Sequence, residues 1–239
     1  MPKRIAVTGS NGFIGKFLVK TLRDSGFMVI EGTRDNADVT NKRLLESFIK
    51  NSDAVVHLAV YQNVFEKSYI RFKKVNVEGS KNVLDLCKKH KKGLILFSSE
   101  VVFNKSDDFY TRSKKAQLET AKKYNNVEIV YPPVVLDLKR KLSWWQLMPG
   151  GVMATIGDGS KKITFIEVRD LCWHVVNLLN GINNELPVKT MTKYQYLDRV
   201  HKISGGFKLP FRTPIWMIRI LAKLFVKTKY SKLLESILD

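Results

Sequence analysis

Cysteine is scarce in this sequence. Only Cys87 and Cys172 occur among its 239 residues, and neither belongs to a CxxC pair or to a Cys/His spacing typical of zinc. Two cysteines cannot form a disulfide framework, so we interpret both as buried thiols in a reducing compartment. The four histidines show no metal-ligand pattern either. The sequence thus predicts neither a metal site nor a fold held together by disulfides.

Long apolar runs are missing as well. No stretch reaches the roughly 18 apolar residues expected of a membrane-spanning helix. The first nine residues lead directly into a strand-like run, which leaves no room for a signal peptide. With 44% hydrophobic and 26% charged residues, the composition is that of a folded globular protein. We therefore expect a cytoplasmic protein.

Acidic residues are few compared with basic ones. The chain has 22 Asp and Glu against 41 Lys and Arg, a net charge of +19. This excess favours an anionic partner, which could be a phosphorylated ligand, an anionic membrane or a nucleic acid. We find no nucleic-acid-binding motif. The stretch 213–239 could lie on a membrane surface as an amphipathic helix, but packing on the domain explains its apolar residues more simply.

Short apolar runs alternate with longer amphipathic segments over the first 133 residues, which is typical of a parallel sheet covered by helices. The predicted strands are 5–8, 27–33, 53–60, 94–98 and 127–131. The predicted helices are 14–25, 44–50, 72–90, 110–124, 168–179 and 192–201, the last opened by a capping-box pattern at Thr192 and Gln195.

We therefore predict an α/β fold, a doubly wound Rossmann-like parallel sheet followed by a small C-terminal region. Residues 1–135 would form the core of this fold and residues 136–239 the C-terminal region. Within the latter, 163–181 would return to the core.

Glycine is concentrated where strand 5–8 meets helix 14–25, in the sequence TGSNGFIG at residues 8–15. Glycines at positions 9, 12 and 15 permit a tight turn and a close approach of the backbone to a phosphate. The helix that follows directs its N–H groups at that phosphate. Strand, turn and helix in this order predict a dinucleotide-binding site.

A candidate catalytic group follows strand 94–98. Tyr110 and Lys114 are four positions apart, so they share one face of a helix and lie about one turn from each other. A free tyrosine has a pKa near 10, and a neighbouring ammonium stabilises the phenolate and lowers that value. Ser99 stands at the carboxyl end of a buried parallel strand, where active sites of open α/β sheets lie. We predict Tyr110 as acid or base and Ser99 as a hydrogen-bond donor to the reacting carbonyl oxygen.

Taken together, these segments resemble the extended short-chain dehydrogenase/reductase family, which includes nucleotide-sugar epimerases and dehydratases. The glycine spacing G-x-x-G-x-x-G after a threonine is one shared feature. Further similar segments follow in the family's order: DVT at 38–40, HLA at 57–59, VNVEG at 75–79, FSS at 97–99, YTRSK at 110–114 and FIEVRD at 165–170. The resemblance covers about residues 3–171. It implies that residues 1–135 form a dinucleotide-binding core and residues 136–239 a reduced substrate-binding region.

The resemblance implies which residues surround the cofactor. Asp38 and Val39 would lie beside the adenine and Ala59 beside a ribose. NAD-preferring relatives carry Asp at the position of Thr33, and Arg34 follows it; a hydroxyl and a guanidinium suit a 2′-phosphate, so we expect NADP(H) rather than NAD(H). The expected cofactor residues are Gly9, Asn11, Gly12, Phe13, Ile14, Gly15, Thr33, Arg34, Asp38, Val39, Leu58, Ala59, Val60, Asn76, Ser98, Tyr110, Lys114 and Pro133. For Asn76, a purely structural role is equally open.

Two departures from the family concern the substrate. Only eleven positions separate Ser99 from Tyr110, where relatives carry a longer loop that lines the substrate pocket, and Tyr131 stands where relatives often have arginine. We expect a smaller or more open substrate site.

The resemblance implies an epimerase or keto reductase that acts on a nucleotide sugar by hydride transfer, with a homodimer as the family's usual assembly. Two alternatives stay open. One is an NADPH-dependent reductase of a small ketone or aldehyde, and the other is an NADP-binding regulatory protein without turnover.

Overall fold

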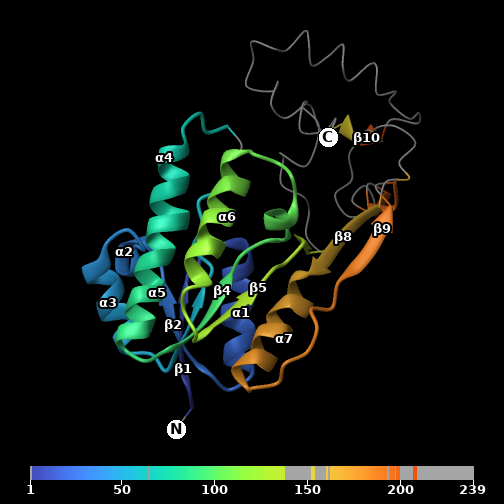
Figure 1. Ribbon diagram of the computed structural model, residues 1–239. Helices are drawn as coiled ribbons and strands as arrows, with labels where there is room; N and C mark the ends of the chain where they lie inside the picture. Colours follow the sequence, from blue (N-terminus) through green and yellow to red (C-terminus); the bar gives the residue numbers. More distant parts are fainter. Residues whose placement is uncertain are drawn as a thin grey trace. The chain divides into compact units, whose positions relative to one another are not determined.

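The computed structural model describes residues 2–63, 65–137, 152–153, 160, 162–192, 194–196, 198–199 and 207–208. The chain forms two units, one of residues 1–133 with 168–187 and one of residues 134–167 with 188–239. The first unit contains all of the predicted catalytic residues (Figure 1).

Five parallel strands form the centre of the first unit. They are β1 (Arg4–Thr8), β2 (Met28–Gly32), β3 (Ala54–His57), β4 (Gly93–Phe97) and β5 (Val127–Val130). Their order is β2-β1-β3-β4-β5, and each neighbouring pair is parallel. The predicted parallel sheet is confirmed. The carboxyl ends of all five strands lie along one edge, and the order reverses beside β1, where sheets of this kind bind ligands.

Helices cover both faces of this sheet (Figure 1). On one face of the sheet, α1 (Phe13–Asp24) packs against α7 (Val168–Leu179). On the other face, α5 (Ser80–Lys89) packs between α3 (Lys42–Lys50) and α6 (Phe109–Ala121). The short helices α2 (Arg34–Ala37) and α4 (Tyr69–Phe72) precede α3 and α5. The fold is therefore doubly wound, as predicted.

The strands are apolar on both sides because both faces are covered. Ile5, Ala6 and Val7 of β1 have no exposed surface, and α3 and α5 supply half of the buried residues of one core cluster. Burying an aliphatic side chain of this size stabilises the fold by about 1.5–3 kcal/mol. A continuous apolar run is the expected sequence of a central parallel strand.

Two predicted elements are shorter or more broken than expected. The strand predicted at 53–60 ends at His57, because Leu58 and Ala59 leave the sheet and lie against the glycine turn. The helix predicted at 72–90 is divided by a π-helical segment, η1 (Lys73–Gly79), between α4 and α5. Asn76 lies inside this segment, where its side chain bonds to another part of the chain. π-Helical turns occur often at functional sites.

The second unit contains two small sheets. One has the order β6-β8-β9, from β6 (Val134–Leu136), β8 (Lys162–Glu167) and β9 (Lys189–Thr192); the other pairs β7 (Val152–Met153) with β10 (Phe207–Lys208). The predicted capping box is present, since Gln195 N donates to Thr192 Oγ1 at 3.1 Å and Thr192 N to Gln195 Oε1 at 2.8 Å. The stretch 213–239 lies outside the described residues.

Among the helices that the structure describes, none is long and apolar enough to cross a membrane. The described residues also contain no group of three or more His, Cys, Asp or Glu side chains placed to hold a metal ion. Cys87 and Cys172 are buried, and burial raises the pKa of each thiol to about 12.

Candidate active site

The glycine turn between β1 and α1 is packed too tightly for side chains. Gly9 has a φ of +71°, and a Cβ there would lie 2.9 Å from the backbone nitrogen of Ala59. A Cβ at Gly15 would collide with the carbonyl oxygens of Gly9 and Ser10. No acidic side chain stands in the first turn of α1. This backbone cradle at a helix N-terminus fits a pyrophosphate group.

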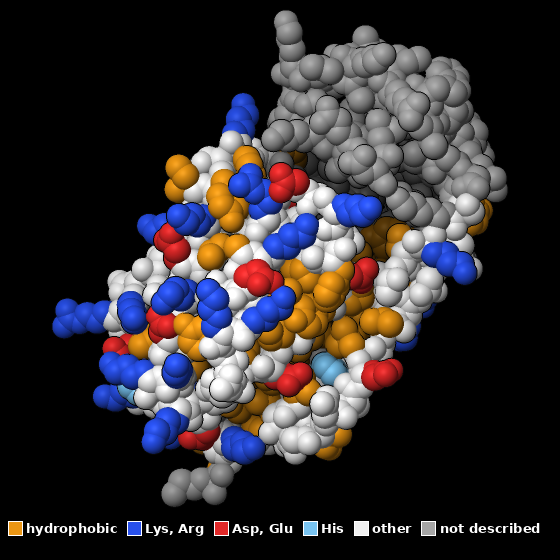
Figure 2. Space-filling model, viewed as in Figure 1, with side chains coloured by type: hydrophobic (Ala, Val, Ile, Leu, Met, Phe, Trp, Pro, Cys, Tyr) orange, Lys and Arg blue, Asp and Glu red, His pale blue; other side chains and the backbone are white. Residues whose placement is uncertain are grey.

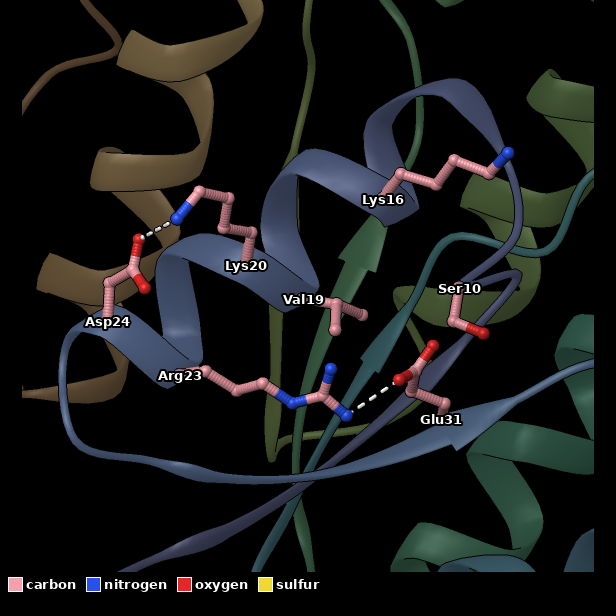
Figure 3. Close-up of a pocket in the computed structure, with 7 residues that line it drawn as sticks. All are labelled: Ser10, Lys16, Val19, Lys20, Arg23, Asp24 and Glu31. Atoms are coloured by element: carbon pink, nitrogen blue, oxygen red, sulfur yellow. Dashed lines mark hydrogen bonds and ion pairs between the residues drawn. The ribbon is translucent and has the colours of Figure 1, made fainter.

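A surface pocket of about 310 Å³ lies beside this turn, between α1 and β2 (Figure 3). Its acidic side chains are held by basic ones: Arg23 bonds to Glu31 at 2.6 Å and Lys20 to Asp24 at 2.7 Å. Glu31 pairs with Val7 in the sheet, one position before the end of β2. Its carboxylate is therefore directed to Arg23 on α1.

Thr33 and Arg34 directly follow β2. Thr33 caps α2, because its Oγ1 accepts a hydrogen bond from Asp35 N at 3.3 Å and its own N–H donates to Asn36 Oδ1 at 2.7 Å. The threonine hydroxyl is thus already engaged locally, whereas the Arg34 side chain is exposed. Of the two residues expected at a 2′-phosphate, Arg34 is the one whose side chain remains available.

The segment after β3 contacts the glycine turn. Leu58 N donates to Thr8 O at 3.2 Å, and Ala59 N donates to Thr8 Oγ1 at 3.2 Å. Val60 is exposed. Leu58, Ala59 and the glycine turn are therefore brought together, as the resemblance implied for a cofactor site.

Asp38 and Val39 lie after α2. The Asp38 carboxylate accepts hydrogen bonds from the backbone and side chain of Thr40 at 2.8 and 2.9 Å. The Val39 side chain packs against Gly79 and occupies the space that a Cβ at that position would need. Phe13 and Ile14 open α1, and Pro133 ends the first part of the unit.

The predicted catalytic side chains meet at the carboxyl end of β4. Ser99 follows β4, and its hydroxyl lies close enough to Tyr110, in the first turn of α6, to influence the pKa of that phenol. Asp108 fixes the start of this helix by accepting from Thr111 N at 3.0 Å. Burial raises the pKa of Tyr110, and the neighbouring Ser99 hydroxyl opposes this rise only in part. Tyr110 therefore keeps its proton at neutral pH.

Lys114 lies one turn further along α6 and is 2% exposed. Its Nζ donates to the carbonyl oxygen of Phe97 at 2.7 Å, and burial lowers its pKa to about 7. We expected this lysine to lower the pKa of Tyr110. In the structure the burial of the phenol dominates instead, and the pKa of Tyr110 lies above its usual value.

Asn76 joins the segment after β3 to α6. Its side chain is fully buried; Oδ1 accepts from Tyr61 N at 2.7 Å, and Nδ2 donates to Tyr61 O and Ser113 Oγ, both at 2.9 Å. Ser113 Oγ in turn donates to Tyr110 O at 2.7 Å. Asn76 therefore helps to fix the backbone that carries Tyr110, which favours a structural role close to the site.

Ser98 is one of the residues that the sequence predicts at the cofactor. Its Oγ is buried without a hydrogen-bond partner, directly after the carbonyl that Lys114 contacts. An orphaned hydroxyl beside the predicted nicotinamide end fits a bound group at this place. The cap at Asp108 could have been predicted from its spacing to Thr111, whereas nothing in the sequence pattern predicted the buried contacts of His57, described below.

Comparison with known proteins agrees with this geometry. Residues 3–125 match the family described as RmlD substrate binding domain. The chain is 31% identical over 109 residues to dTDP-4-dehydrorhamnose reductase of Mycolicibacterium smegmatis, a match that covers 45% of this chain and 33% of that enzyme. It is 29% identical over 215 residues to GDP-6-deoxy-D-talose 4-dehydrogenase of Aggregatibacter actinomycetemcomitans, covering 76% of this chain and 72% of that enzyme.

Solved structures share the fold. The crystal structure of dTDP-4-dehydrorhamnose reductase from Bacillus anthracis in complex with NADP superimposes with a TM-score of 0.73 and 16% identity, covering 88% of this chain and 85% of that one. UDP-glucose 4-epimerase of Thermotoga maritima gives a TM-score of 0.68 with 19% identity, covering 88% and 85%. With the family match over half of its length, the chain belongs to the RmlD substrate binding domain family, within the oxidoreductases of the extended short-chain dehydrogenase/reductase type.

Proposed function

We propose that the protein is an NADPH-dependent reductase of a keto group on a nucleotide sugar. The observation that carries this proposal is the placement of Ser99 directly after β4 beside α6, which carries Tyr110 in its first turn and Lys114 one turn further, with Lys114 Nζ bound to the Phe97 carbonyl of β4. This group stands at the same edge of the sheet as the glycine cradle. The names of both similar enzymes describe nucleotide sugars reduced or oxidised at position 4, which supports a 4-keto sugar as substrate.

The residues divide the chemistry among themselves. NADPH, when bound, supplies the hydride to the carbonyl carbon. Ser99 donates a hydrogen bond to the carbonyl oxygen, and Tyr110 transfers its phenolic proton to that oxygen, so the ketone becomes an alcohol. The ammonium of Lys114 then stabilises the phenolate that is left on Tyr110 until solvent reprotonates it. General acid catalysis of this kind contributes about 10²- to 10⁴-fold in rate.

A reduction needs a proton donor at this position. Burial raises the pKa of Tyr110, so the phenol carries its proton at neutral pH. Arg34 supports NADPH as the reductant because its guanidinium is exposed at the end of β2, while the carboxylate of Glu31 is bound by Arg23.

A second candidate is an NADPH-dependent reductase of a small ketone or aldehyde. The connection from Ser99 to Tyr110 contains a single short 3₁₀ turn, Glu100–Phe103, before α6 begins. So short a connection offers little chain to line a sugar site, which favours a smaller substrate.

Two measurements test the proposal. Mass spectrometry of the small molecules released on denaturation identifies a retained cofactor; retained NAD would favour an epimerase, which regenerates its cofactor in each cycle. Turnover is then measured with NADPH and either dTDP-4-dehydrorhamnose or simple ketones and aldehydes. Binding of NADPH with reduction of the 4-keto sugar supports the proposal. Reduction of only the small carbonyls supports the second candidate, and no affinity for either dinucleotide contradicts both.

Tyr110→Phe tests the proton donor. The variant keeps the ring but lacks the phenolic proton, so we expect turnover to fall at least about 10²-fold. NADPH affinity should stay within a few-fold. Tyr124→Phe is the matched control, because its hydroxyl bonds to Asp85 away from the site, and its turnover should be normal. Normal turnover in Tyr110→Phe would remove Tyr110 from the mechanism.

A further inference from the structure

A chain of buried polar side chains runs through the first unit from the glycine turn to α6. His57 Nδ1 lies 2.7 Å from Thr8 Oγ1, and His57 Nε2 lies 2.9 Å from Ser80 Oγ. Gln117 Nε2 donates to the same Ser80 Oγ at 2.7 Å. All four side chains are at most 1% exposed. The imidazole thus connects two hydroxyl groups that solvent does not reach.

The two ends of this series of hydrogen-bonded side chains lie at the two parts of the proposed site, the glycine turn and helix α6. Thr8 is the last residue of β1 and precedes Gly9, whose backbone forms the phosphate cradle. Gln117 lies on α6, seven positions after Tyr110 and three after Lys114, so the three side chains share one face of the helix. Ser80 opens α5 directly after the π-helical segment.

We infer that His57 is a positioning residue that holds the cofactor turn and the catalytic helix α6 in a fixed relation to each other. The inference rests on the proposed function, because it assigns the two ends of the chain to cofactor and to acid catalysis. Through Thr8 the imidazole fixes the turn, and through Ser80 and Gln117 it fixes the helix that carries Tyr110.

The chemistry of a neutral imidazole suits this task. One ring nitrogen donates and the other accepts, so a single rigid ring can satisfy one hydroxyl on each side. Burial, with a further contribution from the Lys114 charge, lowers the pKa of His57 to about 3, so the ring is neutral at physiological pH. A buried network whose members are nearly all paired rigidifies its surroundings, and losing one member leaves the others unsatisfied.

Ser80→Ala breaks the chain in its middle with the smallest change in volume. We expect the dissociation constant for NADPH to rise and kcat to fall, each by about tenfold, because a buried hydrogen-bond partner is lost on both sides. Ser52→Ala is the matched control: Ser52 is equally buried, but its hydroxyl donates only to the carbonyl of Ile49 at the end of α3. It should lower the melting temperature without changing either constant.

A second pair of variants separates positioning from simple stability. Thr8→Val keeps the shape and removes the hydroxyl, whereas Thr8→Ser keeps the hydroxyl. Positioning predicts that Thr8→Val affects kcat as well as NADPH binding, although Thr8 is at the cofactor end, and that Thr8→Ser restores both. Combining Thr8→Val with Ser80→Ala should then add little to either single effect.

These experiments distinguish a failure of this inference from a failure of the proposed function. If wild-type protein binds no dinucleotide, the proposed function fails. If it binds NADPH and turns over, but Ser80→Ala and Thr8→Val lower only the melting temperature, His57 is structural and the inference is wrong. The inference is also wrong if Thr8→Val changes only NADPH binding, Ser80→Ala changes only kcat, and the two effects add in the double variant. The two ends of the hydrogen-bonded series would then act independently.

Discussion

Lys114 shows how burial changes what a side chain can do. An amine that is 2% exposed is costly to charge, and burial lowers its pKa to about 7. Below that pH the folded protein carries an ammonium group that donates a hydrogen bond to the Phe97 carbonyl oxygen. A buried cation of this kind is weak evidence for stability and is more readily explained by function.

Lys114→Met should therefore abolish turnover and stabilise the fold. At pH 6 the unfolded lysine binds its proton more strongly than the folded one, so its removal should raise the free energy of unfolding by on the order of 2–4 kcal/mol. The gain should shrink as pH rises from about 7 to 10.5, because the folded lysine has released its proton there and the unfolded one has not. Urea unfolding of both proteins across this range tests it. A loss of stability at pH 6 would show that the Phe97 contact outweighs the burial of charge.

Arg34 is the residue on which the cofactor preference depends. Arg34→Ala should weaken NADPH binding about 10- to 100-fold, the loss of a charge-assisted contact to the 2′-phosphate, while NADH binding changes less than about twofold. Arg43→Ala removes another exposed arginine, from α3, and serves as the control. Titration calorimetry with both dinucleotides measures the effect. Equal losses for NADPH and NADH would contradict the assignment.

At the scale of elements, the site depends on how closely β1, α1 and the segment after β3 approach one another. Gly15 shows this, because it lies in the first turn of α1 and any side chain there meets two backbone carbonyls. Backbone cannot move aside as a flexible side chain can. The glycine spacing is therefore a packing requirement before it is a binding motif.

Gly15→Ala should lower the free energy of unfolding by about 1–3 kcal/mol and remove measurable NADPH binding, because the turn must open to admit the methyl group. Gly93→Ala is the control at the start of β4, where a Cβ meets nothing within 4 Å. Its stability should change by no more than about 0.5 kcal/mol. Thermal unfolding and NADPH titration of both variants provide the measurements. Wild-type NADPH affinity in Gly15→Ala would contradict a cradle of this shape.

At the scale of the whole molecule, the net charge of +19 is the dominant feature. Figure 2 shows lysine and arginine side chains spread over the visible face, with fewer acidic ones between them. Such a distribution repels itself in the folded state and attracts anions from a distance. Exposed ion pairs such as Lys20–Asp24 offset little of the repulsion between the basic side chains, since ion pairs at the surface contribute about 0–1 kcal/mol to stability.

We therefore expect salt to stabilise the protein. Raising the ionic strength from about 0.01 M to 0.15 M shortens the screening length from about 30 to 8 Å, and the melting temperature should rise by several degrees. At pH 10.5 the lysines begin to lose their charge, so the same change in salt should have a smaller effect. Differential scanning calorimetry at the two pH values measures both. A melting temperature that falls with salt at pH 7 would show that ion pairs outweigh the general repulsion.

The sheet, the glycine turn and the spacing of Tyr110 and Lys114 could be predicted from the amino-acid sequence alone. These features are local: an apolar run, a glycine pattern and a four-residue helical spacing each act within one element. The boundaries of the strands were predicted less well, because Leu58 and Ala59 continue the apolar run of β3 but leave the sheet and contact the glycine turn.

The burial and the hydrogen bonds of the site residues depend on contacts between elements that are far apart in the sequence. Burial sets the pKa of Tyr110, Arg23 binds Glu31, and His57 joins Thr8 to Ser80. The contacts of His57 with Thr8 and with Ser80 span 49 and 23 positions in the sequence. They exist because β3 pairs with β1 while α5 packs over the same sheet. Strand order and helix packing bring these groups together, and neither is written in the spacing of residues along the chain.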